Sequence, residues 1–262
     1  MSLTFTLIQT ALFWEDIDAN LQQLTQKINS LTAKTEVIVL PEMFSTGFSM
    51  QPEKLAETMN GKAVNWMRQT ATDKRVILTG SLMIEENGKY FNRLIWMLPN
   101  GQFGYYDKRH LFGYANENKH YTAGNKRLIA QAKGFKINLQ VCYDLRFPVW
   151  ARQQTTNNND SEYDILLYVA NWPERRNHAW RTLLTARAVE NQCYVIGVNR
   201  VGNDGNTIYH SGDSMVINAL GETLYHKAHE EDIFTITLEQ EPLEAIRSKL
   251  PFLKDADEFK II

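Results

Sequence analysis

Short runs of consecutive apolar residues constrain the fold of this chain more than any other sequence feature. Val37–Leu40 is the clearest run, and Arg75–Gly80 and Tyr163–Ala170 are of the same kind. Such runs are typical of strands buried on both faces, because a strand with one solvent-exposed face alternates apolar and polar residues. The sequence therefore predicts sheets that are covered on both sides.

Segments with helical periodicity lie between these runs. Apolar residues recur at helical spacing from Ile17 to Leu31, so we expect an amphipathic helix over about Asp16–Leu31. Other expected elements are strands at Thr4–Gln9 and Tyr194–Asn199, and helices at about Ala63–Thr72, His178–Gln192 and Pro242–Leu250.

Turn dipeptides mark hairpins and the last strands of the chain. Lys133-Gly134 separates two β-like segments, Arg127–Gln131 and Lys136–Val141. Similar signals are Asn87-Gly88, Asn100-Gly101, Asp204-Gly205 and Leu220-Gly221, and the last strand is expected to end near Leu238. Alternating βα units and hairpins predict a mixed α/β fold.

We expect one domain spanning residues 1–262. No internal repeat is visible, and the only biased stretch, Gln153–Asp160, is too short for an interdomain linker and is predicted to be a surface loop. A chain of 262 residues with 44% hydrophobic residues can bury a large core.

Charge and composition exclude several classes of function. The 28 basic and 30 acidic residues nearly cancel, so nothing favours nucleic-acid binding. No apolar segment approaches the roughly 18 residues that span a bilayer, and Met1–Thr6 does not resemble a secretion signal. The two cysteines, Cys142 and Cys193, are expected to be reduced, which indicates a cytoplasmic protein without membrane partners.

Metal and nucleotide cofactors have no support in the sequence. The six histidines show no metal-binding spacing. The two glycine-rich motifs that bind phosphate, G-x-x-x-x-G-K-[ST] and G-x-G-x-x-G, are also absent from the sequence. His210–Ser214 lacks the G-x-S-x-G pattern of serine hydrolases and is interpreted as a turn that supports a site. Cys193 is expected to lie in the core.

Three reactive side chains follow predicted strands. Glu42, Lys108 and Cys142 are separated by 66 and 34 residues, yet strand ends of one α/β sheet can bring such residues into one pocket. A carboxylate can take the proton of a thiol, and a lysine can stabilise an oxyanion. From position alone, the alternatives stay open: a capping glutamate, a solvated lysine and a core cysteine.

Three ordered motifs resemble the signature blocks of the nitrilase, or carbon–nitrogen hydrolase, superfamily. The motifs are Pro41-Glu42-Met43-Phe44, Asp107-Lys108-Arg109-His110-Leu111-Phe112 and Val141-Cys142-Tyr143-Asp144-Leu145-Arg146-Phe147-Pro148. The resemblance extends from Thr4 to the C-terminal Asp255–Phe259. It implies a four-layer αββα sandwich, a homodimer and hydrolysis through a cysteine thioester. It also implies Glu42 as base, Lys108 as oxyanion-stabilising cation, Cys142 as nucleophile and Glu117 as a second site glutamate.

Within the superfamily, the sequence is similar to omega-amidases. The step Cys142-Tyr143-Asp144 differs from the Cys-Trp-Glu step of true nitrilases, and Tyr168–Pro173 and Ala186–Gln192 resemble omega-amidase segments. The resemblance implies hydrolysis of the terminal amide of 2-oxoglutaramate or 2-oxosuccinamate. The alternatives are an amidase for deaminated glutathione or N-carbamoyl compounds, and a non-catalytic binding protein on the same fold.

An omega-amidase substrate carries a carboxylate that needs a partner. Arg175 and Arg176 follow Trp172-Pro173, and both are candidates because a guanidinium matches a carboxylate. Arg176 is preferred because it matches the omega-amidase pattern more closely. An exposed basic loop is the alternative. Candidate pocket walls are Phe44, Phe48, Tyr143 and Trp172, whereas Arg146 and Arg187 are expected to form structural ion pairs.

Overall fold

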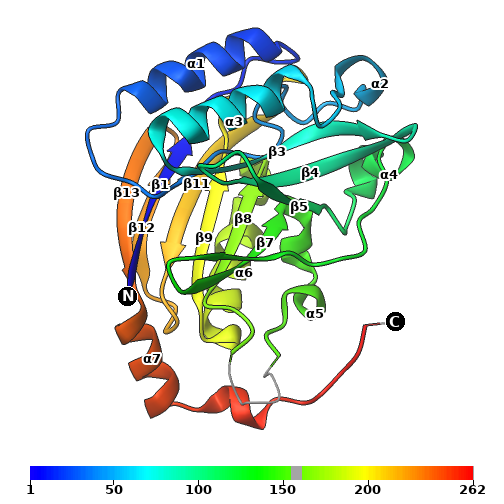
Figure 1. Ribbon diagram of the computed structural model, residues 1–262. Helices are drawn as coiled ribbons and strands as arrows, with labels where there is room; N and C mark the ends of the chain where they lie inside the picture. Colours follow the sequence, from blue (N-terminus) through cyan, green and yellow to red (C-terminus); the bar gives the residue numbers. More distant parts are fainter. Residues whose placement is uncertain (155–160, 262) are drawn as a thin grey trace.

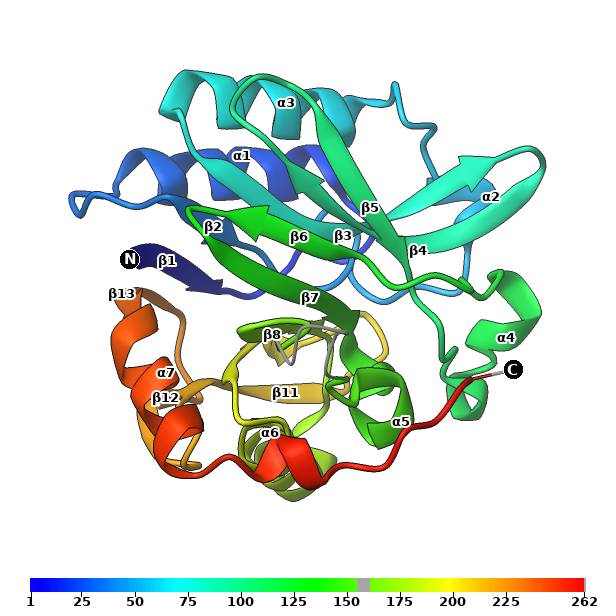
Figure 2. The same cartoon turned by 60° about the horizontal axis from the view of Figure 1, so that its bottom comes forward.

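The computed structural model describes residues 1–154 and 161–261 of the chain, so residues 155–160 of the predicted surface loop lie outside the described residues. Two sheets face each other, with helices on the outer face of each (Figures 1 and 2). The layers run in the order helix, sheet, sheet, helix, which confirms the expected αββα architecture.

The first sheet has six strands and a mixed order. β1, β2 and β3 run parallel, and the remaining neighbours are antiparallel. Its order is β13 (Asp232–Glu239), β1 (Ser2–Gln9), β2 (Val37–Val39), β3 (Ile77–Glu86), β4 (Lys89–Met97) and β5 (Phe103–Asp107).

The second sheet has seven strands with a parallel centre of β7, β8 and β9. Its order is β10 (Val201–Asn203), β11 (Tyr209–Ile217), β9 (Tyr194–Asn199), β8 (Ile165–Ala170), β7 (Phe135–Val141) and β6 (Ile129–Ala132), and β12 (Thr223–Ala228) pairs with β11.

Three long helices cover the sheets. α1 (Ile17–Asn29) and α3 (Lys62–Lys74) lie on the first sheet, and α6 (Asn177–Asn191) lies on the second (Figure 2). The shorter helical elements are α2 (Pro52–Leu55), α4 (Glu117–His120), α5 (Pro148–Ala151) and α7 (Gln240–Lys249), with 3-10 turns at Gly113–Ala115, Cys142–Arg146, Glu174–Arg176 and Phe252–Asp255.

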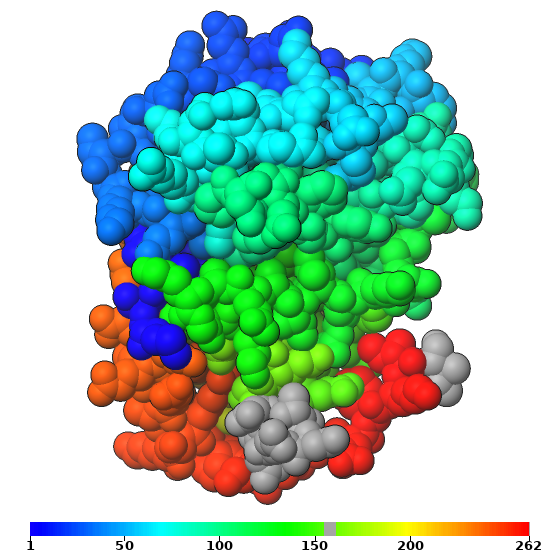
Figure 3. Space-filling view, in the orientation of Figure 1, coloured from blue at the N-terminus to red at the C-terminus, as the bar shows by residue number. Residues whose placement is uncertain are grey.

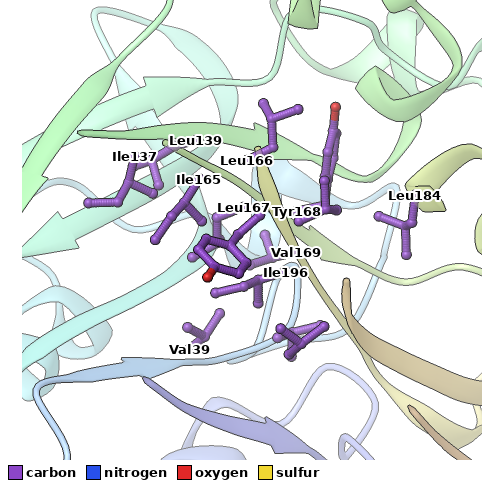
Figure 4. Packing of buried hydrophobic residues seen from close by; sticks show 14 of the residues in the cluster. Val39, Ile137, Leu139, Ile165, Leu166, Leu167, Tyr168, Val169, Leu184 and Ile196 are labelled. Carbon is purple, nitrogen blue, oxygen red and sulfur yellow. The ribbon is translucent and has the colours of Figure 1, made fainter. Parts of the chain in front are cut away.

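Alternation along β2 explains how the first sheet is buried on both faces. Val37 and Val39 pack with residues of the second sheet, whereas Ile38 and Leu40 pack with side chains of α1 and α3. Figure 4 shows Val39 beside the central strands of the second sheet, with Leu184 of α6 beyond them. Continuous apolar runs are therefore required here, because neither face of the strand meets water.

Most predicted elements are confirmed, with shifted ends. Asp16 caps α1 by accepting a hydrogen bond from Ala19 N at 3.0 Å. The strand expected at Arg75–Gly80 begins later, because Arg75 adopts a left-handed conformation (φ 56°) that ends α3. The Asn87-Gly88 turn has positive φ at both residues, as a type I′ hairpin requires.

The interpretation of His210–Ser214 as a turn is wrong. These residues lie inside β11, and the positive φ values of Gly212 (75°) and Asp213 (57°) form a bulge in the strand. A bulge uses the same residue types as a turn, so the composition of the segment does not separate the two.

The C-terminal segment runs across the second-sheet side of the molecule toward α5, drawn in red in Figure 3. There Gln154 Nε2 donates to the carbonyl of Phe259 at 3.4 Å. Within residues 1–154 and 161–261, no helix has both the length and the apolar character needed to cross a membrane.

Candidate active site

Three strand ends bring the candidate residues to one end of the two sheets. Glu42 lies three residues after β2, Lys108 follows β5 directly, and Cys142 follows β7 directly. Cys142 opens a 3-10 turn with φ 44°, a left-handed conformation that is uncommon for a residue other than glycine. The first N–H groups of such a turn, including that of Tyr143, have no partner within the turn and can bind an oxyanion.

Lys108 lies between two glutamates in a fully buried cluster. Its Nζ is 2.9 Å from Glu42 Oε1 and 2.9 Å from Glu117 Oε2, and all three side chains have 0% exposure. Asn92 Nδ2 donates to Glu42 at 2.7 Å and to Glu117 at 3.2 Å. Glu117 also accepts a hydrogen bond from Phe112 N at 2.5 Å. The structure thus brings Glu117, which lies in α4, to Lys108.

The second oxygen of Glu42 is held by the loop after β8. Asn171 N donates to Glu42 Oε2 at 2.8 Å, and Asn171 Nδ2 donates to the Glu42 carbonyl at 2.6 Å. Sequence reasoning missed Asn171 and Asn92 as site residues. Their signal was polarity next to or within apolar strands, because a buried amide needs partners.

The cluster stabilises the charge of Lys108 and opposes that of the thiol. Burial alone would lower the pKa of Lys108, but Glu117 and Glu42 outweigh it and raise this pKa. Burial, reinforced by Glu42, raises the pKa of Glu117 despite Lys108. Burial also raises the pKa of Cys142 well above its ordinary value; Glu42 adds to this effect and Lys108 opposes it. The resting thiol is therefore protonated, and its deprotonation requires a neighbouring base.

Cys142 opens into a cavity of about 220 Å³. Phe48, Tyr143 and Trp172 line the cavity, as the sequence analysis expected. Phe44 does not, because it is buried on the α3 side of the first sheet, with its ring 5.7 Å from that of Trp66. The cavity is large enough for a small molecule, and aromatic rings form part of its wall.

Arg146, Arg175 and Arg176 line the same cavity. Within the part of the chain that the structure describes, none of these three arginines forms an ion pair with Asp or Glu. Arg176 lies 5.1 Å from the ring centre of Phe112, and Arg146 lies 4.8 Å from that of Trp172. Unpaired guanidinium groups at a cavity favour an anionic ligand.

The expectation of a structural ion pair is wrong for Arg146 and confirmed for Arg187. Arg146 packs on an aromatic ring at the cavity instead of meeting a carboxylate. Arg187 pairs with Glu190 at 2.8 Å and donates to the Leu145 carbonyl at 2.6 Å. Cys193 lies in the core with 0% exposure, as expected. In residues 1–154 and 161–261, no group of three or more His, Cys, Asp or Glu side chains is arranged to hold a metal ion.

Comparison with known proteins assigns the chain to a family. The model of the carbon-nitrogen hydrolase family matches residues 4–248, and the chain belongs to this family. It is therefore a hydrolase that acts on carbon–nitrogen bonds.

Two relatives and one crystal structure are similar to the chain over nearly its whole length. The chain is 44% identical to an omega-amidase, YafV, of Escherichia coli K12 over 99% of this chain and 98% of the relative. It is 29% identical to a 2-oxoglutaramate amidase of Bacillus subtilis over 97% and 98% of the two chains. The crystal structure of XC1258 from Xanthomonas campestris, a CN-hydrolase superfamily protein with an arsenic adduct in its active site, superposes with a TM-score of 0.98 at 40% identity and covers both chains fully.

Proposed function

We propose that this protein is an omega-amidase, which releases ammonia from the terminal amide of 2-oxoglutaramate and 2-oxosuccinamate. The observation that carries this proposal is one cavity that joins Cys142 to three arginines without acidic partners. A 2-oxo acid amide suits both features, because its amide can meet the thiol while its carboxylate meets a guanidinium. The omega-amidase and 2-oxoglutaramate amidase relatives support the same choice.

Acylation begins at Cys142. Glu42 takes the thiol proton, and the sulfur attacks the amide carbon to form a tetrahedral intermediate. The ammonium of Lys108 and the N–H of Tyr143 stabilise the negative oxygen. Glu42 then returns the proton to the amide nitrogen, the C–N bond breaks, and ammonia leaves. The product of this half-reaction is a thioester between the substrate acyl group and Cys142.

Deacylation uses the same residues, with water as the nucleophile and the Cys142 sulfur as the leaving group. Glu42 takes a proton from water, which attacks the thioester carbon and forms a second oxyanion beside Lys108. Collapse of this intermediate breaks the C–S bond, releases the 2-oxo dicarboxylate and returns the proton to the Cys142 sulfur. Glu117 serves in both halves by holding Lys108, whose Nζ lies 2.9 Å from its Oε2. One carboxylate thus works as base and acid in turn.

Arg176 is the proposed partner of the substrate carboxylate, with Phe48, Tyr143 and Trp172 as walls. Its pKa is lowered, first by burial and then by Arg175, and the negative charge of a bound carboxylate would favour its charged form. Arg175 and Arg146 line the same space and raise its positive potential, which favours entry of an anion.

The test is ammonia release from 2-oxoglutaramate compared with glutamine and with a neutral aliphatic amide. Both 2-oxoglutaramate and glutamine carry a terminal amide and a carboxylate, so the comparison isolates the 2-oxo group. The proposal requires 2-oxoglutaramate to have the highest kcat/KM. A preference for deaminated glutathione or an N-carbamoyl compound would replace the substrate and keep the thiol chemistry. Absence of labelling at Cys142 by a substrate-like electrophile would favour a non-catalytic binding protein.

We further propose that residues 1–262 work as a single domain, in a homodimer, in the cytoplasm. The apolar core between the two sheets draws on both halves of the chain, which supports one domain. Cys142 and Cys193 are free thiols, which suits a reducing compartment. The superfamily resemblance supports the dimer, and light scattering of the purified protein tests it.

A further inference from the structure

Asp144 lies two residues after Cys142 but does not line the cavity. Its carboxylate is fully buried and accepts four hydrogen bonds from two separate segments. The proposed reaction gives this group no chemical role. Burying a carboxylate is costly unless hydrogen bonds satisfy it, and these four donors do so while fixing the two segments to one group.

One oxygen of Asp144 holds the segment that carries the nucleophile. Oδ2 accepts a hydrogen bond from Val141 N at 3.0 Å. Val141 precedes Cys142 and Asp144 follows Tyr143, so this bond closes a short loop around the cysteine. Cys142 has a left-handed φ of 44°, a conformation that persists only where the surroundings impose it. The bond to Val141 therefore helps to keep the thiol in its orientation.

Both oxygens also hold the segment that carries the lysine. Oδ1 accepts from His110 N at 2.9 Å and from His110 Nδ1 at 2.8 Å, and Oδ2 accepts from Tyr106 Oη at 2.8 Å. Tyr106 Oη in turn accepts from Arg109 N at 3.2 Å and from Trp150 Nε1 at 2.9 Å. Tyr106 lies before Lys108, and Arg109 and His110 lie after it, so the bonds bracket the lysine as they bracket the cysteine.

Side-chain packing reinforces the link. The His110 ring stacks on Phe147 with centroids 3.8 Å apart and planes at 6°, so the lysine segment rests on the turn that follows Cys142. Burial and then the charge of Asp144 raise the pKa of Tyr106, so its hydroxyl stays protonated and continues to donate. In Figure 2, α5, which carries Trp150, lies next to the end of β7, where the nucleophile turn begins.

We propose that Asp144 is a positioning residue that sets the distance and orientation between the Cys142 thiol and the Lys108 ammonium. This inference rests on the proposed roles of Cys142 and Lys108. Asp144 does not line the cavity; it acts through backbone and side-chain hydrogen bonds to the residues that flank each reactive residue. Glu42 and Glu117 hold the lysine side chain, and Asp144 ties its backbone segment to that of the cysteine.

The test is Asp144→Asn, assayed for amide hydrolysis and for alkylation of Cys142 by iodoacetamide across pH. An amide cannot accept all four hydrogen bonds, because its NH2 group faces donors. We expect kcat to fall by roughly 10- to 100-fold, as for a displacement of about 1 Å, while KM changes by less than about twofold. The alkylation profile should shift to higher pH, because a displaced Lys108 no longer lowers the pKa of the thiol.

Asp164→Asn is the matched control. Asp164 is a buried carboxylate that also joins two segments, accepting from Lys136 N at 3.0 Å and from Arg247 Nη1 at 2.8 Å, but it precedes β8 at the end opposite the cavity. This variant should lower Tm while keeping the wild-type kcat and alkylation profile. A folded Asp144→Asn variant with wild-type kcat and alkylation profile would overturn the proposal.

Tyr106→Phe keeps the inference testable if Asp144→Asn does not fold. It removes one hydroxyl and leaves the ring in place. We expect a several-fold fall in kcat with the same upward shift of the alkylation profile, and little further loss when it is combined with Asp144→Asn, because both act through one network. Unchanged kcat in Tyr106→Phe would overturn the proposal. Inactive wild-type enzyme would instead refute the proposed function, since the alkylation profile needs no substrate.

Discussion

Lys108 Nζ lies 2.9 Å from Glu42 Oε1, and neither side chain is exposed to solvent. The pair is not a simple structural ion pair, because Glu42 also receives hydrogen bonds from Asn92 and from the backbone of Asn171. Strand β2, strand β4 and the loop after β8 thus converge on one carboxylate. A carboxylate held from several directions is suited to pass a proton repeatedly without moving.

Glu42→Gln should reduce kcat by about 10²- to 10⁴-fold, the usual worth of a general base. The substitution preserves volume, so circular dichroism and Tm should stay near those of the wild type. Steady-state ammonia release measures the effect. Retention of activity within a few-fold of wild type would mean that another group takes the thiol proton. His110 would then be the first suspect, since the Asp144 carboxylate engages its Nδ1 at 2.8 Å and leaves Nε2 free to accept a proton.

The thiol of Cys142 should titrate at unusually high pH. Burial and the neighbouring Glu42 raise its pKa, so the thiolate forms only above the range of an ordinary cysteine, whose pKa is about 8.5. The rate of alkylation by iodoacetamide should therefore keep rising above pH 9. Stopped-flow or mass-spectrometric measurement from pH 6 to pH 10 gives the curve. A plateau below pH 8 would contradict a protonated resting thiol.

Arg176→Ala should raise KM for 2-oxoglutaramate on the order of 10- to 100-fold, because a hydrogen-bonded charge pair is lost. Hydrolysis of a neutral amide should barely change. Arg175→Ala and Arg146→Ala are the natural comparison variants, since both arginines line the same cavity. If all three variants keep the wild-type preference for the charged substrate, its carboxylate is bound elsewhere.

His210 should make the folded protein sensitive to acid. Burial, followed by the charge of Arg200, lowers the pKa of His210 to about 4 from the usual 6.5. The unfolded state then binds the proton more readily, so stability is present above pH 6.5 and falls as pH drops toward 4. The loss contributed by this group by pH 4 is on the order of 3 kcal/mol. Urea unfolding of wild type and His210→Asn at both pH values measures it, and an equal pH dependence in the two proteins would contradict the assignment.

Local patterns predict much of this fold, and contacts between distant segments account for what they miss. The apolar spacing from Ile17 to Leu31 predicts α1, because a helix that buries one face needs apolar residues at the period of the helix. Residues 210–214 have the composition of a turn but form a bulge, because turns and bulges favour the same residue types. Its placement inside β11 depends on pairing with β9 and β12, which is not a local property.

In the candidate site, too, contiguous motifs predict some residues, whereas other residues are found only from contacts between distant segments. The motifs around Glu42, Lys108 and Cys142 are recognisable because each is contiguous. Asn92 lies in the middle of β4, and nothing beside it in the sequence indicates that it reaches two glutamates at 2.7 and 3.2 Å. Arg146 was expected to pair with a carboxylate, and only the three-dimensional arrangement places it over Trp172 at the cavity.

The most direct test of the account compares Cys142→Ala with Cys193→Ala in ammonia release from 2-oxoglutaramate. Both thiols are buried, but Cys142 opens the turn at the cavity and Cys193 lies in the core. We expect Cys142→Ala to have no measurable turnover while keeping its fold, because no neighbouring group replaces the thiolate. Cys193→Ala should keep kcat even if Tm falls. Substantial turnover by Cys142→Ala together with an inactive Cys193→Ala would contradict the central claim.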